Sequence, residues 1–169
     1  MNKTSTDVLV IGAGPIGLFS VFELGQLGMK SCVVDSLDII GGQCSSLYPE
    51  KPIYDIPAYP EISGQKLIDN LSNQIKPFSP KFILGERVEK IIKENDEFLV
   101  FTSNNKSIKC KCILIAAGNG AFGPNKPPLK DIEEYENKSI FYHITNKSIF
   151  KNKKIAIAGG GDSAVDWAI

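Results

Sequence analysis

Three glycines at fixed spacing near the start of the chain could hold a phosphate group. Gly12, Gly14 and Gly17 form a G-x-G-x-x-G pattern within "DVLVIGAGPIGL", residues 7–18, with Pro15 between the last two. In such a loop the first glycine allows a tight turn, the second lets the backbone approach a pyrophosphate, and the third lets a helix pack closely on a strand. The N–H groups at the start of that helix would face the phosphates. The loop, Pro15 included, is therefore predicted to bind a dinucleotide.

An acidic residue stands where such a site needs one. Asp35 follows the short apolar run "SCVV", at the end of what would be the second strand. It lies about 20 residues beyond the glycines, where a carboxylate can accept a hydrogen bond from a ribose hydroxyl. The alternative is a glycine turn in a core without any ligand. The strand before the glycines, the helix after them and the acidic residue together disfavour that alternative.

A second loop of the same type lies in the last residues, "KIAIAGGGDSAVDWAI". Gly159, Gly161 and Ala164 repeat the spacing after a predicted strand, with Ser163 beside the last of them. Alanine is allowed at the third position of the pattern. Two dinucleotide sites are therefore predicted, and a protein that holds two dinucleotides usually moves electrons between them. The obvious pair is a flavin that stays bound and a nicotinamide that visits.

The apolar pattern predicts the elements that would position these loops. A strand, a helix and a second strand ending in Asp35 make a βαβ unit. Residues 40–60 are rich in Gly, Pro, Ser and Tyr and are predicted to form a long loop. A helix should begin after Ser63, a good N-cap, and end before Pro77. Three further strands over residues 89–118, separated by Asn-rich turns, predict an antiparallel meander.

Composition excludes several classes of protein. The 19 basic and 19 acidic residues give a formal net charge of zero, so no charge pattern for nucleic acid or an anionic membrane is present. The apolar stretch at residues 8–22 is too short to span a bilayer and contains three glycines, so no export is predicted. The four cysteines form no C-x-x-C pair, and free thiols in a reducing cytoplasm are expected. No metal site is predicted.

Taken in order, these motifs resemble the two-dinucleotide-domain flavoprotein reductases of the thioredoxin reductase type. The series is "IGAGPIGL", an acidic residue, "GGQ", "IAAG" and "GGGDSA". The stretches "GGQCSSLYPEKPIYDIPAYP" and "GGGDSAVDWA" look most like the thioredoxin-reductase-like ferredoxin–NADP reductases of bacteria. The resemblance runs nearly from end to end of the chain. It implies FAD at the first site, NADPH at the second, hydride transfer between nicotinamide and flavin, and ferredoxin as the partner that exchanges single electrons.

The resemblance also implies roles for individual residues. Asp35 would hold the adenosine ribose, and Val88 would meet the adenine through its main chain. The flavin half would be contacted by Gln43 and Tyr48, beside a glycine turn that ends at Gly42. Gly118 and Phe122 would lie against FAD at the domain junction; for Tyr48 and Phe122 the alternative is ordinary loop packing. No acid–base side chain is expected, because the cofactor supplies the difficult step.

The absence of two cysteine motifs narrows the type of flavoprotein reductase that the chain resembles. Disulfide reductases of one branch need a second cysteine five residues after Cys44, where this chain has Pro49. Thioredoxin reductases carry a C-x-x-C before the second glycine loop, where this chain has "FYHITNKSIF", whose His143 is expected to be structural. Without a dithiol, electrons must leave the flavin directly for an external acceptor. Two alternatives stay open: a reductase of a quinone or low-molecular-weight disulfide, and a non-catalytic FAD-binding remnant.

The predicted fold class is α/β with two nucleotide-binding domains. A Rossmann-like FAD-binding domain, made of a parallel sheet plus an antiparallel meander, is expected over residues 1–117. The composition break "GNGAFGPNKPP" then begins a Rossmann-like NAD(P)H-binding domain over residues 118–169. That domain needs at least one more strand, so we expect the chain to be an N-terminal fragment or truncated product of a longer reductase. The resemblance implies a homodimer at full length.

Overall fold

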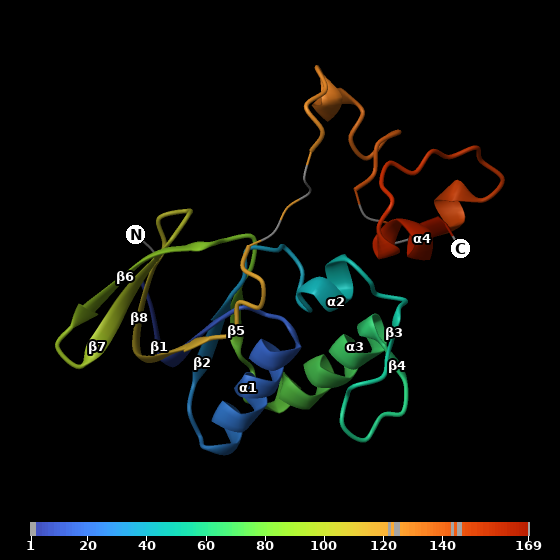
Figure 1. Ribbon diagram of the computed structural model, residues 1–169. Helices are drawn as coiled ribbons and strands as arrows, with labels where there is room; N and C mark the ends of the chain where they lie inside the picture. Colours follow the sequence, from blue (N-terminus) through green and yellow to red (C-terminus); the bar gives the residue numbers. More distant parts are fainter. Residues whose placement is uncertain (1–2, 122, 124–125, 143, 145–146, 169) are drawn as a thin grey trace. The chain divides into compact units, whose positions relative to one another are not determined.

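The structure is a computed structural model that describes residues 3–121, 123, 126–142, 144 and 147–168 (Figure 1). The chain divides into two compact units, residues 1–123 and residues 124–169. The elements of the first unit are β1 (Lys3–Ile11), α1 (Pro15–Gln26), β2 (Ser31–Val34), α2 (Gln43–Ser46), β3 (Pro52–Ile53), β4 (Ile62–Ser63), α3 (Gly64–Ile75), the 3-10 helix η1 (Lys76–Phe78), β5 (Lys81–Ile83), β6 (Val88–Glu94), β7 (Glu97–Thr102) and β8 (Ser107–Ile115). The second unit contains η2 (Ile132–Glu134), η3 (Lys147–Phe150) and α4 (Asp162–Ala168).

The first unit is built on a six-stranded sheet of order β5-β2-β1-β8-β7-β6. Strands β5, β2, β1 and β8 are parallel, whereas β7 and β6 continue the sheet in antiparallel pairing. Both hairpin turns contain an asparagine with a positive φ, Asn95 at 55° and Asn105 at 57°, a conformation that asparagine tolerates well. The predicted α/β class, with a parallel sheet followed by an antiparallel meander, is confirmed.

Two apolar clusters cover the two faces of this sheet. On one face, α1 and α3 pack beside each other, and Leu18 and Ile68 of these helices bury themselves against Val10 and Val33 of the central strands. The second cluster joins Leu9 and other residues of the parallel strands to residues of the meander; its members are Leu9, Cys32, Val34, Ile83, Val100, Ile108 and Cys110. Since successive strand residues point to opposite faces, neighbours in sequence serve different clusters. Burial on both faces fixes the register of β1 and β2.

The predicted helix after Ser63 is present as α3, which ends at Ile75, before Pro77. Its cap is the predicted one, because the Ser63 hydroxyl accepts a hydrogen bond from the Lys66 N–H at 3.3 Å. Ser63→Ala is expected to lower the free energy of unfolding by about 1 kcal/mol, since one N–H of the first turn loses its partner. Urea melts measure the loss. Lys66→Ala is the control, because it changes an exposed helical side chain and keeps the cap; an equal loss in both variants would contradict this role.

Two expectations from the sequence need correction. The segment predicted as a loop at residues 40–60 contains α2 and the strand β3, which pairs with β4. The strand predicted for "KIAIA", residues 154–158, is not formed: Ile155 and Ile157 are 53% and 43% exposed. A strand exists only with a hydrogen-bonded neighbour. The described residues of the second unit contain no strand that could pair with this segment.

Candidate functional site

The first glycine loop connects β1 to α1 by a turn that only glycine permits. Gly12 has a φ of +108°, and a Cβ placed there would lie 2.3 Å from the Ala116 carbonyl oxygen, so a side chain is excluded twice over. Gly17 lies in the first turns of α1, and a Cβ there would lie 1.9 Å from the Gly12 carbonyl oxygen. The two glycines therefore allow the helix to begin directly against the turn that ends the strand.

Gly14 differs from these neighbours because its surroundings are open. It is the N-cap of α1, with φ −71° and ψ −177°, a conformation that any residue can adopt. Apart from its two chain neighbours and the backbone of α1, no atom of the described residues lies within 4 Å of a Cβ placed at this position. The backbone of Gly42 lies close to that of Gly14, since a Cβ placed at Gly42 would lie 3.1 Å from the Gly14 Cα. The loop thus leaves a bare stretch of backbone at the N-terminus of a helix, the arrangement that suits a phosphate group.

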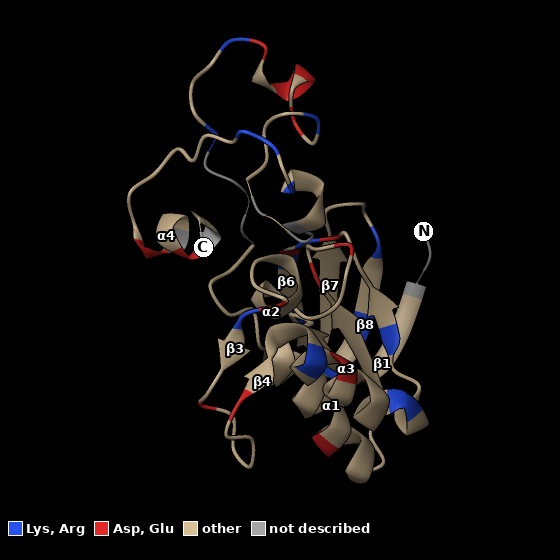
Figure 2. Cartoon of the chain, turned by 90° about the vertical axis from the view of Figure 1, so that its right-hand side faces the viewer, with Lys and Arg blue, Asp and Glu red and all other residues tan. Residues whose placement is uncertain are grey.

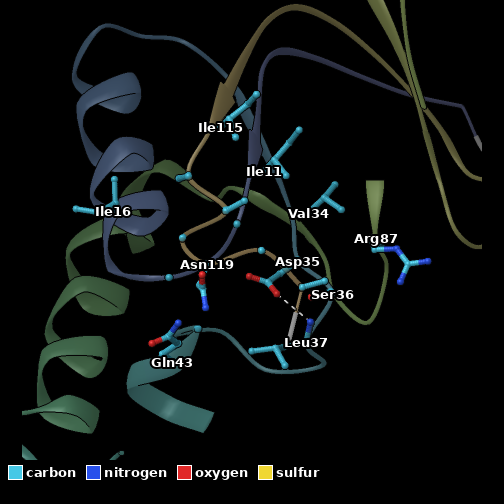
Figure 3. A pocket seen from close by; sticks show the side chains of 18 of the residues that line it. Ile11, Ile16, Val34, Asp35, Ser36, Leu37, Gln43, Arg87, Ile115 and Asn119 are labelled. Atoms are coloured by element: carbon cyan, nitrogen blue, oxygen red, sulfur yellow. Dashed lines mark hydrogen bonds between the residues drawn. The ribbon is translucent and has the colours of Figure 1, made fainter. Parts of the chain in front are cut away.

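A pocket of about 750 Å³ opens beside this loop (Figure 3). It lies at the carboxyl ends of the parallel strands β1, β2 and β8, where α/β folds bind nucleotides. Its lining comes from five segments of the first unit: residues 11–16, residues 34–37, residues 42–48, residues 86–88 and residues 115–121. Its volume lies within the range of small-molecule and cofactor sites.

The pocket brings together most of the residues that the sequence singled out. Those that line it are Gly12, Gly14, Pro15, Asp35, Gly42, Gln43, Tyr48, Val88 and Gly118. Gly17 serves the packing of α1 rather than the lining. Phe122 lies outside the described residues. Gly159, Gly161, Ser163 and Ala164 belong to the second unit.

Asp35 ties the end of β2 to the glycine loop. Its Oδ2 accepts a hydrogen bond from the Ala13 N–H at 2.6 Å, and its Oδ1 accepts one from the Leu37 N–H at 2.8 Å, the dashed line in Figure 3. An ionised carboxylate offers about four acceptor positions. Asp35 can therefore hold the loop in place and still accept hydrogen bonds from hydroxyl groups in the pocket.

Cys44 and Tyr48 line the pocket close to each other. Burial raises the pKa of the Cys44 thiol, and the interaction with Tyr48 lowers it by less. Burial also raises the pKa of the Tyr48 hydroxyl, helped by Cys44 and Asp55. Because the thiolate is the reactive form, a buried thiol with a raised pKa is a weak nucleophile. The thiol in this pocket is therefore suited to packing rather than to a covalent step.

The remaining cysteines are also free thiols, without a partner that could make a redox pair. Burial raises the pKa of Cys32 to about 11, and it raises the pKa of Cys110 as well. Cys112, two residues further along the same strand as Cys110, is exposed. Within the described part of the chain, no group of three or more His, Cys, Asp or Glu side chains could hold a metal ion.

Several lining residues were not predicted. Glu86 is only 2% exposed, Ser36 and Leu37 follow the predicted ribose-binding carboxylate, and Asn119 points toward Gln43 in Figure 3. Asn119 had a signal in the sequence, since it lies inside the "IAAGNGAFGP" motif. Glu86 had none, because a glutamate between two strands is ordinarily exposed.

The second glycine loop forms the expected turn into a helix. Gly159 has a φ of +146°, and a Cβ there would lie 3.7 Å from the Ala164 Cβ. Helix α4 then begins at Asp162, and the N–H groups of Ala164 and Val165 donate to the Gly161 carbonyl oxygen at 2.9 and 3.3 Å. Ser163 lies in the first turn of this helix. The loop therefore presents a helix N-terminus preceded by three glycines.

Charge on the chain is mixed rather than segregated. Basic and acidic residues are interspersed along the chain in Figure 2, in keeping with a formal net charge of zero. Among the described residues, no helix combines the length and the apolar character that crossing a membrane requires.

The family to which the chain belongs follows from this combination of loop, pocket and sheet. Residues 6–169 match the family model described as pyridine nucleotide-disulphide oxidoreductase, so the chain is a member of that family.

Curated relatives give a narrower likeness. The chain is 59% identical to the ferredoxin–NADP reductase of Anaplasma phagocytophilum over 163 residues, which cover 96% of this chain and 48% of that protein. It is 58% identical to the corresponding protein of Ehrlichia canis over 169 residues, which cover 100% of this chain and 50% of that protein. The chain thus spans about half the length of the curated relatives it matches.

Solved structures share the fold. A thioredoxin reductase from Streptococcus pyogenes matches with a TM-score of 0.60 at 23% identity, covering 79% of this chain and 41% of that chain. Cyclohexanone monooxygenase from Rhodococcus sp. Phi1, bound to NADP+, matches with a TM-score of 0.60 at 21% identity, covering 77% of this chain and 29% of that chain. At these identities the likeness concerns the fold and not the activity.

Proposed function

We propose that the whole protein is a flavoprotein reductase that transfers electrons between NADPH and ferredoxin through bound FAD. The observation that carries this proposal is the identity of 58–59% with ferredoxin–NADP reductases over 96–100% of this chain. The chain contributes the first glycine loop, the pocket and the second glycine loop to that activity.

The pocket fits FAD at its most demanding point, the approach of a pyrophosphate to the backbone. The open space at Gly14 is a cradle that a Cβ would fill, and it lies at the N-terminus of α1, where anions are favoured. Asp35 would accept hydrogen bonds from the ribose hydroxyls. Val88 would meet the adenine, and Gln43 and Tyr48 would contact the flavin half. When bound, FAD would accept a hydride and release electrons one at a time. The chain would hold and orient the cofactor.

The second loop is proposed as the NADPH site. A helix N-terminus preceded by glycines is suited to the phosphates of this nucleotide. The residues assigned to it are Gly159, Gly161, Ser163 and Ala164. Gly118 and Phe122 are proposed to contact FAD. The division between the two nucleotide-binding domains is proposed between residues 117 and 118.

We also propose that the whole protein is cytoplasmic and forms a homodimer. Four free thiols suit a reducing compartment. The homodimer is supported by the resemblance to the thioredoxin reductase type.

An experiment on the whole protein can determine which electron acceptor it reduces. The whole protein, purified with FAD, is mixed with NADPH and one of three electron acceptors: ferredoxin, a quinone or a low-molecular-weight disulfide. The rate at which each acceptor is reduced is then measured. Fast bleaching of ferredoxin, with slow turnover of the other two acceptors, is expected. Preference for the quinone or disulfide would replace this function by the neighbouring reductase class, and FAD binding without any NADPH oxidation would indicate a non-catalytic module.

A further inference from the structure

A buried carboxylate lines the pocket without a role in the function proposed above. Glu86 is 2% exposed. Its Oε2 accepts a hydrogen bond from the Thr102 hydroxyl at 2.5 Å, and its Oε1 forms an ion pair with the Lys106 Nζ. Burial alone would raise the pKa of Glu86, but the hydrogen bonds from Lys106 and Thr102 and the charge of Lys106 hold it below its usual value. These three side chains are called the Glu86 triad below.

The Glu86 triad is attached to a short segment that borders the pocket. This segment, residues 85–88, is called the strap. The Gly85 N–H donates to the Leu37 carbonyl at 2.8 Å, and the Glu86 N–H donates to the Asp35 carbonyl at 2.9 Å. One edge of the strap is therefore fixed to the end of β2, beside the carboxylate proposed to hold the ribose.

The other edge of the strap is fixed to the β7–β8 hairpin. The Ser103 N–H donates to the Arg87 carbonyl at 2.8 Å, and the Arg87 N–H donates to the Ser103 hydroxyl at 3.2 Å. The register of β6 against β7 shifts just after Val88, as in a β-bulge. Bulges beside pockets re-aim main-chain and side-chain groups.

The hairpin turn holds the other two members of the triad in fixed positions. The Thr102 N–H donates to the Lys106 carbonyl at 3.1 Å, and the Lys106 N–H donates to the Thr102 hydroxyl at 3.3 Å. Both side chains therefore leave the turn at defined points and converge on Glu86. A buried carboxylate is tolerated only with such compensation, and removal of one partner is strongly unfavourable.

We propose that the Glu86 triad positions the strap so that its main chain recognises the base of the bound nucleotide. The triad makes no contact with the base itself; it sets the place and orientation of the peptide groups around Val88. This inference rests on the proposed FAD site, since it assigns the adenine to the strap. A main-chain carbonyl can accept from the adenine amino group and an N–H can donate to the adjacent ring nitrogen. Hypoxanthine reverses both groups, so a fixed strap should favour adenine over hypoxanthine.

The experiment compares ADP with IDP on the 169-residue chain by isothermal titration calorimetry. In Glu86→Gln, the affinity for ADP should fall about tenfold, the scale of one or two lost hydrogen bonds. The affinity for IDP should fall much less, so the preference for ADP should shrink about threefold or more. Lys106→Met, at a half-exposed position, should act in the same direction, and Lys106→Arg should restore the preference.

The matched control is Lys109→Met. It breaks the Lys109–Glu97 ion pair, an exposed pair at 2.5 Å on the same hairpin that does not touch the strap. Its ADP and IDP affinities should stay within about twofold of the unaltered chain, since exposed pairs contribute little.

Two results would overturn the inference while leaving the FAD site intact. The first is equal affinity of the unaltered chain for ADP and IDP. The second is a preference for ADP that stays unchanged in both Glu86→Gln and Lys106→Met, because the affinities for the two nucleotides are unchanged or fall equally. The second result would mean that the triad stabilises the fold alone. Failure of the whole protein to bind either FAD or ADP would instead contradict the proposed function itself.

Discussion

Gly14→Ala is expected to weaken FAD binding strongly while leaving the first unit folded. The φ and ψ of Gly14 suit alanine, and in the described part of the chain the new methyl group would meet no atom within 4 Å beyond its chain neighbours and the backbone of α1, so the fold has no reason to change. The methyl group would occupy the space through which a pyrophosphate reaches the backbone. FAD affinity, measured by the quenching of flavin fluorescence, should fall at least about a hundredfold, as a phosphate forced from its hydrogen bonds loses several kcal/mol.

The same variant should unfold at nearly the urea concentration of the unaltered chain, within about 0.5 kcal/mol. Gly161→Ala is the control, because it adds a methyl group in open space in the second glycine loop and should leave FAD binding unchanged. Full FAD affinity in Gly14→Ala would place the pyrophosphate elsewhere and remove the main geometric support for the site.

Gly17→Ala is expected to do the opposite and destabilise the fold itself. Its methyl group would lie 1.9 Å from the Gly12 carbonyl oxygen, a backbone atom that cannot turn aside. Either α1 or the turn after β1 must move, and both are held by the fully buried residues Leu18 and Val10. The free energy of unfolding should fall by about 3 kcal/mol, the upper range for overpacking a core.

Urea melts of the two variants side by side test this contrast. Gly28→Ala is the control for Gly17→Ala: Gly28 has a φ of +69° and open surroundings, so only backbone strain of about 1 kcal/mol is expected. If Gly17→Ala unfolded within about 1 kcal/mol of the unaltered chain, the close approach of helix and strand would not be a requirement of this loop.

Sequence patterns predicted those parts of the fold whose geometry is local. Glycine spacing placed the turn between β1 and α1, and Ser63 marked the start of α3. In both places a few neighbouring residues determine the backbone, through the space at a missing side chain or through one hydrogen bond. The same holds for the hairpin turns at Asn95 and Asn105.

Features that depend on distant partners were not predictable in this way. Glu86 is buried because Thr102 and Lys106, 16 and 20 residues further on, converge on it in space. The apolar alternation of residues 154–158 predicted a strand, but a strand also needs a neighbour, which the spacing of apolar residues cannot supply.

Strand β8 has a consequence for the order in which the molecule can assemble. It pairs with β1 along its whole length, from Lys3 opposite Ser107 to Ile11 opposite Ile115, although the two strands lie about a hundred residues apart in the chain. Such long-range pairing is slow, because a large loop must close before any contact is gained. During synthesis the ribosome must therefore release residue 115 before β1 has both neighbours, and a nascent chain has no complete nucleotide pocket until then.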